Sequence, residues 1–191
     1  MTIDRAKFFA TVRARLGRLS ASQVEGIERI LDAIDGAPLA HQAYMLATPW
    51  HETDATMQPV REAFKLSEEW RKRNLRYWPW YGRGDVQLTW EENYRKADRA
   101  LAKAGLIKAG ALLANPDLAM RPDISAFILR RGMTDGWFSG KKLSDYLPAS
   151  GVATRAQYIQ ARRIINILDK ADLVEDYAQV FERALRDGGL S

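Results

Sequence analysis

Two glutamates, Glu52 and Glu62, are the residues of this chain whose type and spacing best suit acid/base chemistry. Glu52 stands in the tripeptide His51-Glu52-Thr53, and Glu62 follows an arginine. Hydrolysis of a glycosidic bond needs one carboxyl group to protonate the leaving oxygen and a second to activate water or attack carbon. The pair supplies that minimum, although a glutamate taken alone is more often an exposed residue of a helix or loop.

Further polar groups follow in the glycine-rich segment 81–90, which reads Tyr-Gly-Arg-Gly-Asp-Val-Gln-Leu-Thr-Trp. The alternation of polar and apolar residues over 85–89 predicts a short strand. On it, Gln87 and Thr89 would share a face and could hold a water molecule or a sugar amide near a carboxylate. Thr89 has a second interpretation, because with Glu92 it would form a capping box for a following helix. Both roles of Thr89 are compatible with the sequence.

A metal site at His51 is disfavoured by the residues around it. The second histidine of an HExxH zinc motif is missing, since Ala55 stands at that position, and His41 is the only other histidine. The chain has no cysteine to complete a ligand set. We therefore predict no metal and no other cofactor. We expect His51 either to hydrogen-bond Glu52 or to be a half-buried structural residue.

The composition favours one domain with an anionic partner. A length of 191 residues suits a single catalytic domain over 1–191 without a separate wall-binding module. The formal net charge of +5 favours nucleic acid or an acidic polymer such as a bacterial wall. Nucleic acid has no support beyond this charge. The densest basic run, residues 71–76, is typical of an ordinary solvated segment.

Hydrophobic periodicity predicts a mainly helical chain. A capping box of Ser20 with Gln23, or alternatively of Ser22 with Glu25, would begin the second helix, and Pro49 could kink or restart the third. Helices are expected around residues 8–16, 23–34, 39–53, 90–105, 124–133, 158–168 and 174–185.

Residues 55–80 show poor periodicity and are expected to form a long, ordered loop region, which could hold a short helix within 61–70. Loops of that length are usually functional. The segment ends in an aromatic run, Tyr-Trp-Pro-Trp-Tyr at 77–81, whose rings could stack on sugars or pack in the core.

Taken together, these motifs resemble the family 19 glycoside hydrolases, the chitinase-like family that also contains many phage endolysins. The matches run in family order over residues 39–170. They comprise His51-Glu52-Thr53, Arg61-Glu62, Tyr81-Gly82-Arg83-Gly84, Gln87-Leu88-Thr89-Trp90, Asn93-Tyr94, Asn115-Pro116-Asp117-Leu118 and Arg163-Ile164-Ile165-Asn166. The combination is specific, although each piece alone is not.

The resemblance implies a lysozyme-like, mainly α-helical (α+β) fold with a very small strand element beside a substrate cleft, and an inverting mechanism. It makes Glu52 the general acid and Glu62 the base, with Glu68 and Glu69 as rivals for the base, and it makes Thr89 the residue that positions water. The substrate-binding residues are expected to be His51, Tyr81, Arg83, Gln87, Asn93 and Asn166.

We therefore expect a monomeric endolysin that cleaves the β-1,4 glycan strands of peptidoglycan. No apolar stretch is long enough to insert into a membrane, and no Sec-type signal is visible at the N-terminus. An enzyme made in the host cytoplasm and released to the periplasmic wall by a holin fits both features. The alternatives are a chitinase of the same family and a non-catalytic wall-binding or virion-associated protein on the same fold.

Overall fold

The structure is a computed structural model that describes residues 3–191. Within this range the chain forms nine α-helices, three short 3-10 helices and one two-stranded sheet. The α-helices are α1 Arg5–Leu16, α2 Ala21–Ile34, α3 Leu39–Glu52, α4 Glu68–Asn74, α5 Glu91–Lys103, α6 Ala111–Ala114, α7 Pro122–Asp135, α8 Arg155–Ala161 and α9 Ala171–Asp187. The 3-10 helices are η1 Pro116–Met120, η2 Leu143–Asp145 and η3 Arg162–Ile164.

Local capping sets the ends of the first two helices. The Asp4 side chain accepts a hydrogen bond from the Lys7 N–H to begin α1, and Gly17, whose φ of 88° suits glycine, caps the end of α1. Ser20 and Gln23 form the capping box that begins α2, so this alternative of the two predicted from the sequence is confirmed.

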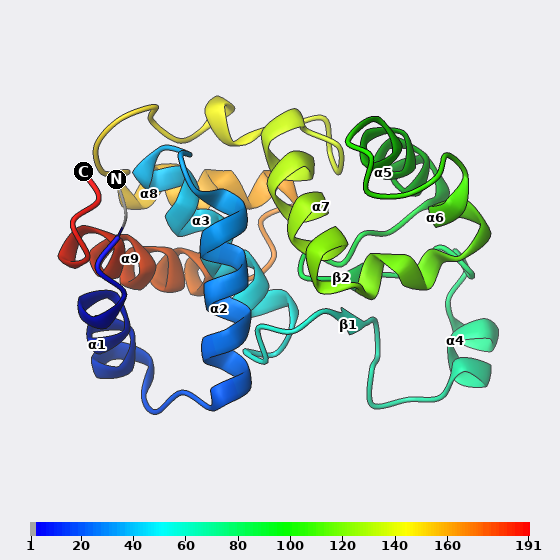
Figure 1. The fold of residues 1–191 in the computed structure, drawn as a ribbon, viewed down its shortest axis with the longest axis horizontal. Helices are drawn as coiled ribbons and strands as arrows, with labels where there is room; N and C mark the ends of the chain where they lie inside the picture. Colours follow the sequence, from blue (N-terminus) through cyan, green and yellow to red (C-terminus); the bar gives the residue numbers. More distant parts are fainter. Residues whose placement is uncertain (1–2) are drawn as a thin grey trace.

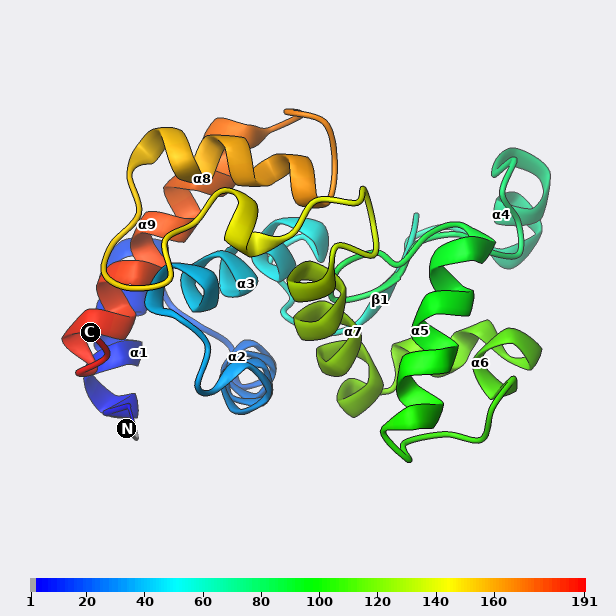
Figure 2. The same cartoon turned by 90° about the horizontal axis from the view of Figure 1, so that it is seen from above.

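The most deeply buried helix is α3. All of its residues from Leu39 to Trp50 are buried. It packs mainly on α9 and also on α2 and α7, while α9 packs on α1 and α8. The two views show α1, α2, α3, α8 and α9 on one side of the molecule and α4, α5 and α6 on the other, with α7 and the sheet between (Figures 1 and 2).

Pro49 does not restart α3, which runs unbroken to Glu52. The backbone N–H of Thr53 continues the helical pattern by donating to the Pro49 carbonyl at 3.0 Å, and the Thr53 hydroxyl donates to the same oxygen at 2.7 Å. Burial on all sides offsets the one hydrogen bond that a proline cannot donate. Glu52 is therefore the last residue of the helix.

No helix of residues 3–191 is long and apolar enough to cross a membrane.

The sheet lies earlier in the chain than the sequence predicted. Strand β1, Val60–Arg61, pairs antiparallel with β2, Arg83–Gly84. Residues 85–89 are not a strand: the chain turns back so that Leu88 bridges to Arg83, and Gln87 has a φ of 51°. Val86 and Leu88 are both buried, which produced the alternation that a strand would show.

The segment 55–80, expected to be mostly loop, contains β1 and α4. The helix lies over 68–74 and not within 61–70. Arg71 explains the order of this region, because its buried guanidinium donates to the carbonyls of Glu62 at 2.7 Å and Ala63 at 2.9 Å. One side chain thus fastens α4 to the stretch that follows β1.

The helix expected over 158–168 is shorter than predicted. It ends at Ala161 and passes through η3 into a loop before α9. The Asn166 side chain accepts a hydrogen bond from the Ile167 N–H at 2.8 Å, which competes with helical pairing, and Ile167 is 78% exposed. The loop leaves Asn166 at a cavity wall.

Candidate active site

Both candidate catalytic glutamates line one cavity of about 470 Å³. Glu52 reaches it from the end of α3 and Glu62 from the residue after β1. The lining residues are Glu52, Glu62, Tyr77, Val86, Gln87, Thr89, Trp90, Asn93, Phe138, Ile165 and Asn166. Six of the nine site residues predicted from the sequence are therefore brought together: Glu52, Glu62, Gln87, Thr89, Asn93 and Asn166.

Glu52 is held by a buried arginine. Arg162 donates from Nη1 to the Oε1 atom of Glu52 at 2.6 Å and from Nε to the carbonyl of Asp169 at 2.9 Å. The Arg162 side chain is 2% exposed and that of Glu52 is 16% exposed. The buried guanidinium of Arg162 thus orients the carboxyl group of Glu52.

Glu62 has a hydrogen-bond donor on each carboxylate oxygen. The Tyr77 hydroxyl donates to Oε1 at 2.5 Å and the Gly82 N–H donates to Oε2 at 2.9 Å. Burial, together with the hydrogen bond and the negative charge of Glu62, raises the pKa of Tyr77 to about 12, so this hydroxyl keeps its proton and remains a donor. The Glu62 side chain is thereby fixed in one direction.

Thr89 and Gln87 face the cavity from a turn, whereas the sequence predicted a strand. The Thr89 hydroxyl donates to the Gln87 carbonyl at 2.7 Å, and the Gln87 amide donates to the carbonyls of Val60 at 3.0 Å and Gly84 at 3.1 Å. Gly82 makes room for this arrangement, because a Cβ on it would lie 2.7 Å from the Gln87 side-chain oxygen and would displace that side chain.

The capping box predicted for Thr89 with Glu92 does not form. Trp90 occupies the residue before α5, and no side chain caps this helix. Asn93, in the first turn of α5, instead donates from its side chain to the Thr89 carbonyl at 3.0 Å. Thr89 therefore does not cap α5, and of its two predicted roles only the one at the cavity remains.

Tyr81 and Arg83 do not line this cavity, and their role in substrate binding stays a prediction. They line a neighbouring cavity of about 770 Å³. Arg83 is 4% exposed and lies 3.6 Å from the Tyr81 ring centroid, and it donates to Asp117 at 2.7 Å and to the Tyr94 hydroxyl at 3.0 Å. The guanidinium of Arg83 therefore makes contacts within the protein. The local sequence Arg-Gly-Asp does not indicate these contacts.

His51 is half-buried beside Glu52 and does not line the cavity either. Burial lowers the pKa of His51, the charge of Glu52 opposes this shift, and the charge of Arg162 adds to it. A neutral imidazole at neutral pH follows. Of the two interpretations left open by the sequence, the half-buried structural residue agrees with this placement.

The rival glutamates lie elsewhere. Glu68 lines the larger cavity, where its carboxylate accepts from the Tyr81 hydroxyl at 2.8 Å and from the Trp78 indole at 3.1 Å. Glu69 is exposed in the first turn of α4. Among these three glutamates, only Glu62 shares a cavity with Glu52.

Two residues that shape the site were missed by sequence reasoning, namely Arg162 and Tyr77. Arg162 follows Tyr158 by one helical turn and lies next to Ala161, so it falls on the apolar face that buries both of these residues. A cation within such a face signals a buried partner. Tyr77 has no comparable signal, because its partner Glu62 is reached only through the fold.

No protein-family model matches the sequence, and no curated protein does. Among solved structures, the chain is similar to chitinase C from Streptomyces griseus HUT6037, with 20% identity and a TM-score of 0.57. The match covers 99% of this chain and 93% of the chitinase chain. A mutant of chitinase C gives 20% identity, the same coverage and a TM-score of 0.59.

A bacterial family 19 chitinase is similar as well, with 21% identity, a TM-score of 0.53 and coverage of 99% of this chain and 96% of that chain. At this level of identity the likeness shows the fold. The lysozyme-like, mainly α-helical fold of the family 19 chitinases, which the motifs implied, is therefore confirmed.

Proposed function

We propose that this protein is a glycoside hydrolase that cleaves a β-1,4-linked glycan, with Glu52 as the general acid and Glu62 as the base. The observation that carries the proposal is the shared cavity, in which two carboxylates from different elements face Thr89 and Gln87. Its likeness to chitinase structures supports the same reaction class.

In this mechanism Glu52 gives its proton to the leaving oxygen, and Arg162 stabilises the carboxylate that remains. Glu62 takes a proton from the attacking water. The Thr89 hydroxyl already donates to the Gln87 carbonyl, so Thr89 Oγ1 is free to accept a hydrogen bond from that water. An inverting reaction needs the two carboxyl groups roughly 6.5 to 9.5 Å apart to admit the water.

We infer that the substrate is peptidoglycan and that the protein acts as an endolysin, reaching the periplasmic wall after holin-type release. The formal net charge of +5 supports an anionic wall polymer as the partner. A chitinase is the second candidate, and it is favoured by the names of the similar structures.

Loss of turbidity of permeabilised Gram-negative cells tests the catalytic assignment. Glu52→Gln and Glu62→Gln should each lower the rate at least about 100-fold, since general acid or base catalysis contributes that much. Glu69→Gln is the matched control, because Glu69 is an exposed glutamate outside the cavity, and it should clear cells at the wild-type rate. Equal clearing by the wild type and Glu52→Gln would refute the assignment of the acid.

The products separate the remaining alternatives. Mass spectrometry of the reducing ends released from peptidoglycan distinguishes a muramidase from a glucosaminidase, and release of short oligomers from chitin alone would identify a chitinase. NMR of the anomer formed first tests inversion. Binding to walls without any cleavage would identify a non-catalytic wall-binding protein.

A further inference from the structure

A basic and aromatic rim is defined here as two pairs, Lys72 with Trp78 and Arg76 with Trp90. Trp90 lines the candidate active-site cavity, and the Trp78 indole donates to Glu68 at the neighbouring larger cavity. The Lys72 ammonium lies 5.2 Å from the centroid of the Trp78 ring, and the Arg76 guanidinium lies 5.4 Å from that of Trp90. Both indoles are exposed, Trp78 by 39% and Trp90 by 47%. Two cation and aromatic pairs thus present flat apolar surface and positive charge together.

The rim is joined to the catalytic cavity through Trp90 and Tyr77. Trp90 lines the cavity, and its ring centroid is 4.9 Å from that of Tyr77, the residue that holds Glu62. Trp90 also has a φ of 74°, an unfavourable conformation for a bulky residue, and its N–H donates to the Trp80 carbonyl at 2.9 Å. The fold therefore fixes an exposed indole at the edge of the site.

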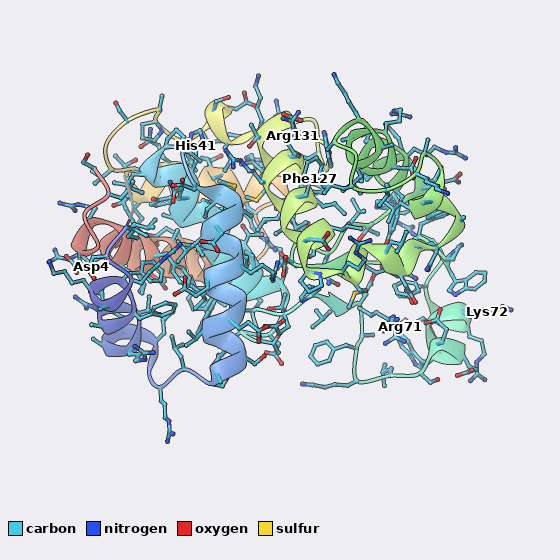
Figure 3. The ribbon with its side chains drawn as sticks, viewed as in Figure 1. Asp4, His41, Arg71, Lys72, Phe127 and Arg131 are labelled. Carbon is cyan, nitrogen blue, oxygen red and sulfur yellow. The ribbon has the colours of Figure 1, made fainter. Side chains whose placement is uncertain are left out.

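The two cations of the rim have no acidic partner. Within residues 3–191, no carboxylate lies within ion-pair distance of Lys72 or Arg76. Figure 3 shows Lys72 and Arg71 on opposite sides of α4. The arginines of the larger neighbouring cavity differ, because Arg61 and Arg83 both pair with Asp117.

We propose that this rim binds the carboxylates of the stem peptides on a peptidoglycan strand whose sugars occupy the catalytic cavity. This inference rests on the proposed function and specifies its substrate. Chitin is a neutral polymer of one amino sugar and offers no carboxylate, whereas alternate sugars of peptidoglycan carry acidic peptides. The unpaired positive charges of Lys72 and Arg76 are therefore complementary to peptidoglycan and not to chitin.

The test measures binding, so it does not require turnover. The parent protein carries Glu52→Gln, and its affinity is measured by calorimetry for soluble glycan strands that keep their stem peptides and for strands stripped of them by an amidase. The ratio of the two affinities measures how much the stem peptides contribute to binding. In the variant Lys72→Gln/Arg76→Gln this ratio should fall by about tenfold, since each exposed ion pair contributes about two- to fivefold.

Two further variants sharpen the result. Lys72→Arg/Arg76→Lys keeps both charges and should retain most of the ratio. Arg15→Gln removes one exposed charge from α1, which lies on the other side of the molecule, and should leave the ratio unchanged. Circular dichroism confirms that each variant is folded.

The outcomes separate the two proposals. An unchanged ratio in the double glutamine variant, or an equal fall in Arg15→Gln, would overturn the assignment of the stem peptide to the rim while leaving glycan binding in place. If the parent protein binds neither kind of strand, both the rim assignment and the proposed glycosidase function are wrong.

Discussion

Glu62 owes its direction to two donors from different parts of the chain, the Tyr77 hydroxyl and the Gly82 N–H. A general base acts efficiently only when its lone pair points at the proton that it removes. The two donors leave little freedom for the carboxylate to rotate. At the scale of the residue, the proposed chemistry therefore depends on Tyr77, a side chain that itself has no reactive role.

Tyr77→Phe should lower kcat for glycan hydrolysis by about tenfold, because the hydrogen bond from a hydroxyl to a charged group contributes about 1.5 to 3 kcal/mol and the Gly82 N–H still holds the other oxygen. KM should change little. Steady-state kinetics provide the measurement, with Tyr177→Phe as the control, since Tyr177 lies on α9, packs against Trp50 and does not line the cavity. An equal loss in both variants would show that Tyr77 does not act through Glu62.

Among the elements, the two strands of the β1–β2 sheet are both joined to η1 through one aspartate, Asp117. Asp117 accepts from Arg61 of β1 at 2.8 Å and from Arg83 of β2 at 2.7 Å. Burial alone would raise the pKa of Asp117, but the hydrogen bonds and charges of both arginines outweigh it and hold the pKa below its ordinary value of 3.8. An ionised carboxylate thus anchors the two-stranded sheet, whose strand β1 is followed directly by Glu62.

Asp117→Asn should lower the free energy of unfolding at pH 7 by about 1 kcal/mol, a modest loss because Asp117 is 44% exposed and solvent screens its pairs. The stabilisation from a depressed pKa is complete above pH 3.8 and is lost as the pH falls through the lower value of the folded state. Urea unfolding from pH 7 to pH 3 should show the two proteins converging at the acidic end. A constant difference would contradict this origin.

The elements differ in how far the sequence predicted them, and the reason is length. The apolar stripes of α2 and α9 extend over several turns and were recognised, and their ends agree within a few residues. The β1–β2 sheet pairs only two residues per strand, too few to show a period. The alternation over 85–89 arose instead from a turn that buries Val86 and Leu88.

For the molecule as a whole, the site joins segments that are far apart in sequence. The contact between Glu52 and Arg162 spans 110 residues, and it links the end of α3 to η3. Motif order identified the cavity-lining residues Glu52, Glu62, Gln87, Thr89, Asn93 and Asn166 but not Arg162. Long-range partners of this kind leave no spacing rule in the sequence.

A double-mutant cycle tests this long-range contact. Arg162→Met should lower the free energy of unfolding by about 2 to 4 kcal/mol in the wild type, because it leaves a mostly buried carboxylate without its partner. The cost should be smaller in the Glu52→Gln background. Urea unfolding of the four proteins gives the coupling energy. Strict additivity would mean that the two side chains do not stabilise each other.

The 110-residue span also determines when the proposed active site is completed during synthesis of the chain. A ribosome adds residues in order, so Glu52, Glu62 and Thr89 emerge well before Arg162. Until η3 has emerged and docked, Glu52 lacks the cation that orients it. A nascent chain would therefore display most of the cavity wall before the proposed acid is held in place, and the proposed hydrolysis would begin only after Arg162 has emerged.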